Sequence, residues 1–323
     1  MNGISCAINT SEMKAFKKRI NANDFEIALG EKLSVFVKNK IKKTNLFYRE
    51  LTQAERDEVL KRITDFLFSK FSVSAGRHRF IQWESGWREN LSEFQKSKKI
   101  IALIPRYFGK YRVNRFRQRF IMALNKNFEI GMLSILEYWL FNKYFRDFPI
   151  IYEFGCGTGH NLLRLREVNR KAELWGLDWA KSSQKLIRGI AKTLGDKKIK
   201  TRPFDFFRPD KEFRLNPNGA IFTVAALEQT GKSYKKFVSY LIKNRVSMCF
   251  HIEPIGELLD ENVLIDNLSI RYFNKRNYLS GYINYLRKLE KNGTIKIYAA
   301  KRTYIGSMFI DGYSIIIWSP IEK

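Results

Sequence analysis

Residues 149–160 constrain the fold more than any other part of the chain. They read Pro-Ile-Ile-Tyr-Glu-Phe-Gly-Cys-Gly-Thr-Gly-His. The apolar run 150–152 is typical of a short buried strand, and the residues after 160 carry apolar side chains at helical spacing. We therefore expect a strand, a glycine turn and a helix in direct succession.

The glycines and the acid of this stretch have different physical roles. Gly155, Gly157 and Gly159 permit backbone angles that side chains forbid, and they let a ligand approach the main chain closely. Glu153, at the end of the strand, can accept hydrogen bonds from a ligand and disfavours a phosphate group. A dinucleotide site instead spaces its glycines as Gly-x-Gly-x-x-Gly and holds a pyrophosphate at the helix N-terminus. A glycine turn without any ligand is the alternative interpretation.

Strand and helix patterns alternate after this stretch, which favours a mainly parallel sheet with helices on both faces. We expect strands at 172–178, 199–204, 219–227 and 246–253, and helices at 182–194, 233–242 and 278–291. The first two of these strands lead into Asp178 and Asp205. Asp178 follows Gly159 by 19 residues, a spacing that suits a carboxylate binding a ribose diol beside the neighbouring strand.

Residues 153–159 fit the first motif of the class I S-adenosylmethionine-dependent methyltransferases, Asp/Glu-x-Gly-x-Gly-x-Gly, at every fixed position. From about 148 to 320 the chain resembles these enzymes, whose sheet has five parallel strands and a C-terminal antiparallel pair. Apolar patterns at 294–300 and 313–318 match that pair. The resemblance implies an α/β, Rossmann-like fold and S-adenosylmethionine as cofactor. It also implies that Asp205 reaches the adenine amino group and that Phe206 covers the ring.

The first 147 residues are expected to form a helical region on the substrate side of a methyltransferase domain at 148–323. Apolar side chains recur at helical spacing in 12–20, 25–37 and 128–145, and residues 52–55 have the sequence of a capping box. Trp83 and Trp87 lie in this region. They predict either a lid over the cofactor or an ordinary corner of the core.

The formal net charge is +27, and the basic excess is spread over both parts of the chain. Residues 95–128 contain ten Lys or Arg and no acid. Such a stretch attracts phosphates, nucleic acid or anionic lipid headgroups, or it forms a solvated face. We expect a cytoplasmic protein that could lie peripherally at the inner membrane surface, because no membrane-spanning run or secretory signal is visible. The three scattered cysteines show neither disulfide nor zinc spacing, and we expect no metal site.

Methyl transfer needs an aligned acceptor and, for a hydroxyl acceptor, a group that removes its proton. The ends of the fourth and fifth expected parallel strands supply three catalytic candidates, Glu228, His251 and Glu253. Glu253 ends its strand before a proline, whereas His251 is either a general base or a hydrogen-bonded core histidine. His160 is expected to begin the helix after the glycine turn rather than to take part in chemistry.

Residues 266–278 are rich in polar and aromatic side chains. They predict either a surface loop or a wall of the acceptor pocket, in which Arg271, Lys275 or Arg276 binds an anionic group. The chain lacks the Asn/Asp-Pro-Pro-aromatic run of enzymes that methylate nucleobase amino groups. It also lacks the Pro-Cys of enzymes that attack pyrimidine C5, and the His/Asp cluster of a metal-dependent catechol enzyme.

The sequence therefore favours O-methylation of a small molecule, anionic or lipid-linked, such as a sugar or a glycolipid precursor. The saccharide hypothesis rests on the runs 83–87, 227–229 and 251–254, which resemble those of uncharacterised bacterial methyltransferases from surface-polysaccharide clusters. An RNA methyltransferase that uses the basic surface is the second hypothesis. A non-catalytic nucleotide-binding scaffold is the third.

Overall fold

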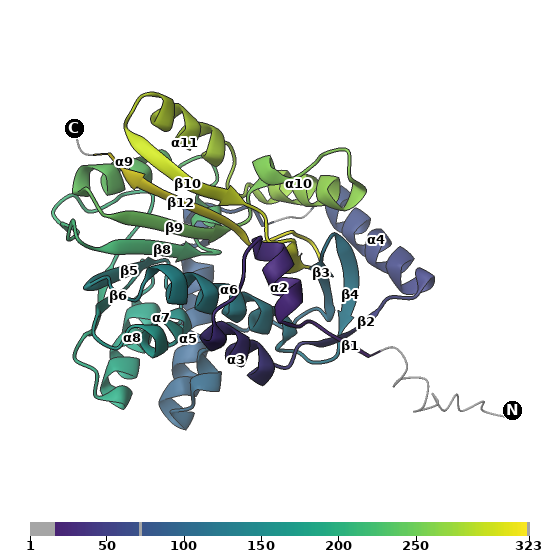
Figure 1. The fold of residues 1–323 in the computed structure, drawn as a ribbon, viewed down its shortest axis with the longest axis horizontal. Helices are drawn as coiled ribbons and strands as arrows, with labels where there is room; N and C mark the ends of the chain where they lie inside the picture. Colours follow the sequence, from purple (N-terminus) through teal and green to yellow (C-terminus); the bar gives the residue numbers. More distant parts are fainter. Residues whose placement is uncertain (1–16, 71–72, 322–323) are drawn as a thin grey trace, which may run out of the picture.

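A computed structural model describes residues 17–70 and 73–321 of the chain. Within these ranges the larger sheet has seven strands in the order β10-β12-β9-β8-β5-β6-β7 (Figure 1). The strands are β5 (Ile150–Phe154), β6 (Glu173–Asp178), β7 (Ile199–Pro203), β8 (Ala220–Val224), β9 (Met248–Glu253), β10 (Ile295–Lys301) and β12 (Ser314–Pro320). Strands β5 to β9 pair in parallel, and β12 runs antiparallel to both of its neighbours, β9 and β10. The predicted α/β sheet, five parallel strands with a C-terminal antiparallel pair, is confirmed.

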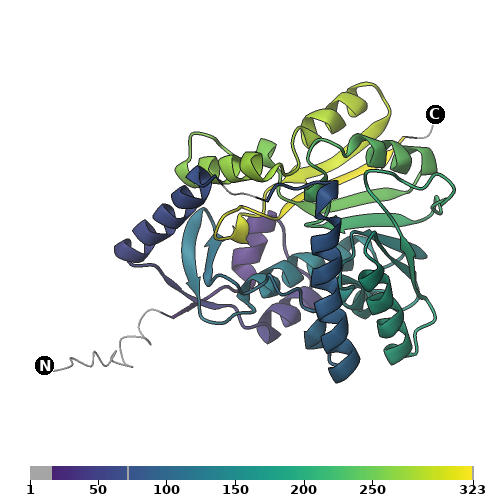
Figure 2. The same ribbon diagram turned by 180° about the vertical axis from the view of Figure 1, so that it is seen from behind.

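Helices cover both faces of this sheet (Figures 1 and 2). On one face α6 (Phe128–Tyr144), α7 (His160–Val168) and α8 (Lys181–Leu194) share a hydrophobic cluster with Ile151 of β5. On the other face α9 (Lys235–Asn244) and α11 (Tyr282–Lys291) pack with Tyr152 of the same strand. The two clusters are separate because successive side chains of a strand point to opposite faces. Helix α5 (Phe80–Ser97) packs alongside α8 and reaches the carboxyl ends of the strands.

The N-terminal region contains a second sheet in addition to the expected helices α2 (Ala22–Leu29), α3 (Val35–Lys43) and α4 (Gln53–Phe68). In the described residues this sheet has the order β1-β2-β4-β3-β11. Its strands are β1 (Lys18–Arg19), β2 (Phe47–Glu50), β3 (Val113–Phe116), β4 (Arg119–Ala123) and β11 (Ile305–Ser307). The basic stretch 95–128 thus supplies a hairpin, and β11 adds a strand from the far end of the chain.

Several boundaries differ from the expected ones. The pattern at 25–37 is interrupted, since α2 ends at Gly30, which has a left-handed φ of 66°, and α3 begins after its N-cap residue Ser34. The expected helix at 12–20 lies largely outside the described residues, and residues 18 and 19 form β1. Residues 100–103 form a 3-10 turn. The polar segment 266–278 is mostly helical, within α10 (Leu264–Arg276).

Helix α6 joins the two parts of the chain because it is buried on nearly all sides. The Phe141 ring lies 5.1 Å from that of Phe222 in β8, and Phe145 lies 4.4 Å from Phe250 in β9, centroid to centroid. The expected boundary at 147 therefore falls between two elements that share one core. No helix in the described part of the chain, α6 included, has both the length and the apolarity that crossing a membrane requires.

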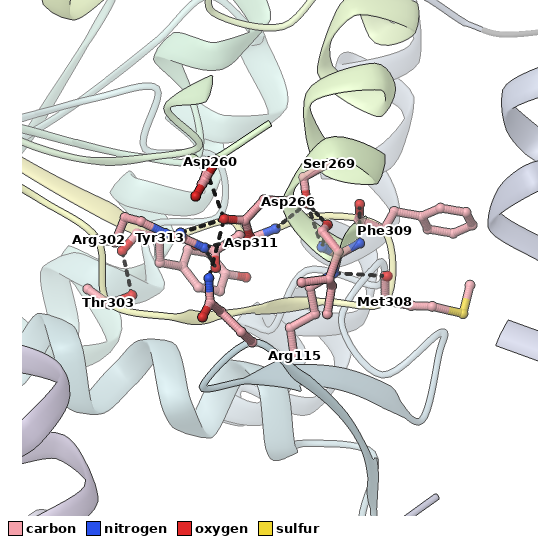
Figure 3. Close-up of polar contacts among 12 residues, drawn as sticks. Arg115, Asp260, Asp266, Ser269, Arg302, Thr303, Met308, Phe309, Asp311 and Tyr313 are labelled. Carbon is pink, nitrogen blue, oxygen red and sulfur yellow. Dashed lines mark hydrogen bonds and ion pairs between the residues drawn. The ribbon is translucent and has the colours of Figure 1, made fainter. Parts of the chain in front are cut away.

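A buried polar network connects β3, α10 and the loop before β12 (Figure 3). Arg115 donates to the hydroxyl of Ser269 (2.6 Å) and to the main-chain carbonyls of residues 265, 308 and 309. Arg302 donates to both carboxylate oxygens of Asp266 (2.7 and 2.8 Å) and to Asp311 (2.9 Å). Both guanidinium groups are therefore held by several oxygens, which offsets the cost of burying their charge.

Candidate active site

The glycine loop connects β5 to α7 at the carboxyl end of the sheet. Gly155 and Gly157 both have a positive φ, 73° and 51°. A Cβ atom at Gly157 would lie 2.9 Å from the ring of Trp87, and one at Gly155 would meet Ala226. Side chains are therefore excluded at both positions, and the main chain of the loop faces a cavity directly. Gly159 is instead packed against α8.

The cavity over this loop has a volume of about 80 Å³ and opens to solvent. Its aromatic lining residues are Trp83, Trp87, Tyr107, Trp179, Phe204, Phe206 and Phe207. Its polar lining residues are Thr158, His160, Asn161, Asp178, Gln229 and Thr230. Both parts of the chain contribute. Mostly apolar walls with a few hydrogen-bonding groups are typical of a small-molecule site.

Trp83 and Trp87 lie one turn apart on α5 and form the wall over the glycine loop. Their ring centroids are 5.4 Å apart at an interplanar angle of 25°, and Tyr107 meets Trp83 edge-on at 6.4 Å. Glu84, between them in sequence, accepts hydrogen bonds from the main-chain N–H (3.1 Å) and the hydroxyl (2.6 Å) of Ser182. These bonds fasten α5 to the first turn of α8. The tryptophan pair lines the cavity, and Trp87 also belongs to the hydrophobic core, so the structure agrees with a corner of the core that borders the cavity.

Asp178 ends β6 and lines the cavity beside the glycine loop. Its Oδ2 accepts a hydrogen bond from the N–H of Gly157 (3.0 Å), and its Oδ1 accepts one from the N–H of Ala180 (2.8 Å). Burial raises the pKa of this carboxyl to about 6, although the two N–H groups act in the opposite direction. Each oxygen keeps a further lone pair, so the carboxylate can also accept hydrogen bonds from a ligand.

Glu153 lies beneath the glycine loop rather than in the cavity wall. Its Oε1 accepts a hydrogen bond from Asn161 (2.8 Å), and its Oε2 is buried without a partner among the described residues. Arg164 donates to Asn161 (2.8 Å) and to Glu137 of α6 (2.7 Å). Burial raises the pKa of Glu153 well above its ordinary value. This carboxyl therefore orients Asn161, and the Asn161 side chain lines the cavity.

Asp205 follows β7 at the outer edge of the site. Its Oδ1 accepts a hydrogen bond from the N–H of Phe207 (2.8 Å), and its Oδ2 accepts one from Arg77 (3.2 Å). Phe206 and Phe207 line the cavity, whereas the Asp205 side chain is not part of its lining. The three predicted acids thus stand at the ends of adjacent strands, and Asp178 is the one that faces the cavity.

His160 begins α7, as expected, and its ring also lines the cavity. The hydroxyl of Thr158 donates its proton to the carbonyl of Leu103 (2.6 Å), because a carbonyl can only accept. The 2.8 Å contact between this hydroxyl and Nδ1 of His160 is then donated by the ring. Nε2 is left as a bare acceptor, and it is buried without a partner among the described residues. Burial and the Arg164 charge lower the pKa of His160 well below its ordinary value, so the ring stays neutral.

His251 lies in the core, outside the cavity lining. Its Nε2 accepts a hydrogen bond from the indole N–H of Trp318 (3.0 Å) and contacts the hydroxyl of Tyr282 at 3.0 Å. Nδ1 therefore carries the proton and donates to Thr223 (2.9 Å). Burial lowers the pKa of the ring to about 3. These contacts agree with the interpretation of His251 as a hydrogen-bonded core histidine.

Glu253 and Glu228 flank the turn that follows β8. Glu253 accepts hydrogen bonds from three consecutive N–H groups, those of residues 226, 227 and 228 (3.1, 3.0 and 3.1 Å). Glu228 accepts one from the side chain of Gln229 (2.8 Å). Burial, with the charge of Glu253, raises the pKa of Glu228 to about 8. Neither carboxyl lines the cavity, but each bonds a residue that does, Ala226 and Gln229 respectively.

Trp179, Phe207 and Tyr107 are among the cavity residues that the sequence analysis did not identify. Trp179 and Phe207 come one and two positions after Asp178 and Asp205, so their place beside predicted acids was a usable signal. Tyr107 lies far from the glycine loop in sequence, and no local pattern marks it. Among the described residues, no group of three or more His, Cys, Asp or Glu side chains is arranged to hold a metal ion.

No family model matches the sequence, and no curated protein matches it. Solved structures that match the fold are remote in sequence. The S-adenosylhomocysteine-bound methyltransferase PaMTH1 of Podospora anserina is 13% identical over 84% of this chain and 97% of that chain, with a TM-score of 0.42. Geranyl diphosphate methyltransferase, solved with S-adenosylmethionine, is 11% identical over 61% and 92% (TM-score 0.43). The small RNA methyltransferase HEN1 is 13% identical over 63% and 28% (TM-score 0.44).

Similarity at this level says nothing about a substrate, and the fold is defined by the chain's own sheet. Five parallel strands run from β5 to β9, and β12 is inserted antiparallel between β9 and β10. The glycine loop follows the first of these strands, and an acid ends the second. The chain therefore has the Rossmann-like fold of the class I S-adenosylmethionine-dependent methyltransferases.

Proposed function

We propose that the protein is an S-adenosylmethionine-dependent methyltransferase that methylates a hydroxyl group of a small molecule. One observation carries this proposal. The carboxylate of Asp178 and the bare main chain of Gly155 and Gly157 face a single cavity at the carboxyl ends of β5 and β6, beneath aromatic rings. Open α/β sheets bind their ligands at this edge.

The lining suits each part of S-adenosylmethionine. Trp179, Phe206 and Phe207 offer ring faces against which an adenine base can pack, and Asp178 can accept hydrogen bonds from the ribose hydroxyls. The unpaired Nε2 of neutral His160 can accept a hydrogen bond from the ammonium group. When bound, this cofactor supplies a methyl group activated by the sulfonium.

A small acceptor suits the cavity better than a polymer. Trp83, Trp87 and Tyr107 cover the side of the glycine loop, so an acceptor that enters the cavity meets aromatic rings on this side. Ring faces pack well against a small apolar or amphipathic acceptor. The side chains of Tyr107 and Gln229 are the polar groups that could orient an acceptor hydroxyl there.

Two of the three catalytic candidates are assigned a positioning role in this proposal. Glu253 holds the main chain of Ala226 in the cavity wall, and Glu228 orients the amide of Gln229. Since neither carboxyl lines the cavity, neither is expected to take the acceptor proton directly. His251 is not carried forward, because its ring nitrogens are engaged within the core.

Calorimetry of the full chain with S-adenosylhomocysteine tests the cofactor assignment. We expect a Kd in the micromolar range, which corresponds to about −8 kcal/mol. Absence of binding at millimolar S-adenosylhomocysteine would contradict the proposed function.

The acceptor class is tested by transfer of a labelled methyl group from S-adenosylmethionine into a cell extract separated into small molecules, lipids and RNA. Label in the small-molecule or lipid fraction supports the proposal, and the partition between the two separates a free sugar from a glycolipid precursor. Label in RNA, with an affinity that falls steeply with salt concentration, favours the RNA methyltransferase instead. Binding without label in any fraction favours the scaffold.

A further inference from the structure

Two arginines beside the cavity have no carboxylate hydrogen-bonded to them among the described residues. Arg79, the last residue of the 3-10 turn η1 (Arg77–Arg79), is 7% exposed. Arg276 ends α10 and is half-buried, and its Nε is fully buried without a hydrogen-bond partner among the described residues. In the same residues, neither guanidinium forms an ion pair with a carboxylate. An uncompensated buried charge is costly, so the site is incomplete as it stands.

Arg79 contacts two residues of the cavity wall, although neither Arg79 nor Arg276 is itself part of the lining. It donates to Gln82 (3.0 Å) and to the amide oxygen of Gln229 (3.0 Å), and its guanidinium lies 4.9 Å from the ring centroid of Trp83. Gln229 and Trp83 both line the cavity. The charge of Arg79 is therefore adjacent to the part of the cavity wall that Gln229 and Trp83 form.

Arg276 is brought to the same place by main-chain contacts. The N–H of Ala75 donates to the carbonyl of Arg276 (2.6 Å), and the Asn277 amide donates to the carbonyl of Ala75 (3.1 Å). A Cβ atom at Gly231 would lie 2.9 Å from that same amide, so the turn after β8 touches this junction. Segments 75–79, 228–231 and 276–278 thus meet beside the cavity. Burial and the neighbouring Arg276 charge lower the pKa of Arg79, as expected of two cations close together.

Aromatic rings and one carboxyl surround the pair. The Arg276 guanidinium lies 5.9 Å from the ring centroid of Tyr272 and 5.6 Å from that of Tyr278. Glu228 is the nearby carboxyl, but its hydrogen bond goes to Gln229, and burial raises its pKa to about 8. A carboxyl that is protonated near neutral pH does not cancel the two positive charges. The cluster therefore keeps a net positive charge.

Buried arginines elsewhere in the chain show the difference. Arg115 and Arg302 are surrounded by carbonyl, hydroxyl and carboxylate oxygens, which the dashed lines in Figure 3 mark. Those side chains serve the fold. The Arg79 and Arg276 pair has free donor capacity and stands next to a cavity, and planar guanidinium groups bind carboxylates and phosphates in bidentate geometry.

We infer that Arg79 and Arg276 bind an anionic group of the methyl acceptor, a carboxylate or a phosphate monoester carried by a small molecule. The inference rests on the proposed methyltransferase function, since it assigns the second substrate of the same cavity. Because Arg79 is only 7% exposed, the pair suits a compact anion, whereas the backbone of a nucleic acid needs an exposed surface. The anchored anion would hold the acceptor at the Gln229 end, with its hydroxyl directed toward the glycine loop.

The test uses the full chain saturated with S-adenosylhomocysteine and titrated with inorganic phosphate or with acetate, observed by NMR. We expect one site per chain, and the stronger of the two anions identifies the chemical group. Arg276→Gln should weaken binding at least tenfold, and Arg79→Gln should do the same. Arg271→Gln is the matched control, since this exposed arginine lies on the same helix and donates only to Asn267 among the described residues. Its affinity should stay within twofold of the wild type.

Equal anion affinity in Arg276→Gln and in the wild type would overturn the inference. If Arg79→Gln fails to fold, the Arg276→Gln variant still tests the inference. The Arg276 side chain forms no hydrogen bond among the described residues, so its replacement removes none from the fold. A 5′-phosphorylated RNA oligonucleotide that displaces phosphate better than a free sugar phosphate would also overturn it. If S-adenosylhomocysteine does not bind, the proposed function is contradicted. An anion titration in the absence of S-adenosylhomocysteine still measures anion binding by the arginine pair.

Discussion

Replacing Asp178 by asparagine tests the cofactor site most directly. The carboxylate accepts hydrogen bonds from the N–H groups of Gly157 (3.0 Å) and Ala180 (2.8 Å), and it faces the cavity. Asparagine has nearly the same shape but keeps one acceptor oxygen, and its NH2 group would face a main-chain N–H. The substitution therefore removes the charge-assisted contact that we propose between this side chain and the ligand, and it leaves one N–H of the protein unpaired.

The expected magnitudes follow from these contacts. Losing a hydrogen bond to a charged group costs about 1.5–3 kcal/mol, which corresponds to a Kd raised roughly tenfold to somewhat over a hundredfold. The unpaired N–H lowers the free energy of unfolding by about 1–3 kcal/mol, less than the total of about 5–15 kcal/mol for a typical domain. Because burial raises the pKa of Asp178 to about 6, the wild-type carboxyl is largely protonated below that pH. The difference in Kd should therefore be larger at pH 7.5 than at pH 5.5.

Calorimetry with S-adenosylhomocysteine at both pH values measures this effect. Asp210→Asn is the matched control, because this partly exposed carboxylate pairs with Arg202 (2.6 Å) and does not line the cavity. Its Kd should stay within about twofold of the wild-type value, since exposed ion pairs contribute little. A folded Asp178→Asn variant with wild-type affinity at pH 7.5 would refute the assignment of the ribose to this carboxylate.

Three further substitutions test the loop, a buried carboxyl and the polar network. Gly157→Ala places a methyl group 2.9 Å from Trp87 at a left-handed φ of 51°, so the S-adenosylhomocysteine Kd should rise at least tenfold in calorimetry; an unchanged Kd contradicts close approach to the loop. Glu228→Gln removes a carboxyl whose pKa burial raises from 4.5 to about 8. Between pH 5 and 8 the folded state keeps this proton and the unfolded state loses it. The free energy of unfolding of the wild type, measured by urea titration, should therefore fall relative to that of the variant by about 1.4 kcal/mol per pH unit. Parallel curves of stability against pH for the two proteins would contradict the raised pKa of Glu228. Arg302→Met leaves the buried carboxylates of Asp266 and Asp311 without their shared cation and should lower the free energy of unfolding by about 3–5 kcal/mol, measured by urea titration. A decrease of less than about 1 kcal/mol would show that the fold does not depend on this ion-pair network.

Local patterns predicted the larger sheet because its central strands are short, apolar and bounded by loop residues. The capping box is a similar case. The N–H of Glu55 donates to the hydroxyl of Thr52 (3.2 Å), the N–H of Thr52 donates back to the Glu55 carboxylate (2.9 Å), and α4 begins at the next residue, Gln53. Such signals succeed because the groups that make the structure are neighbours in sequence.

The second sheet was not predicted, because its turn and its partners give no local signal. Arg117 and Gln118 form the tight turn between β3 and β4 with positive φ angles of 50° and 57°, where glycine or asparagine would have marked a hairpin. Strand β11, which pairs with β3, comes from the far end of the chain. The basic stretch was judged by its charge, yet Arg115 within it is buried by contacts from α10 and the loop before β12.

The candidate site divides in the same way. Asp178 and the glycines were found because loop, strand end and spacing are local. The Arg79 and Arg276 pair was not, because it exists only where three distant segments meet. Arg276 had been considered as an anion-binding residue of a loop or pocket wall, but its partner Arg79 carried no signal of its own.

The histidine and the glutamate of β9 show why strand parity alone does not locate a catalytic group. They are two residues apart, so their side chains leave the strand on one face, which is also the face of Cys249. Later elements of the chain cover that face. Trp318 of β12 and Tyr282, the first residue of α11, are the hydrogen-bond partners of Nε2 of His251. Glu253 lies beyond this cover, at the strand end, where three N–H groups of the β8 turn take up its carboxylate. The carboxylate that holds the turn is thereby kept out of the cavity, so in the proposed reaction the acceptor would be oriented by groups of the turn and of the N-terminal region.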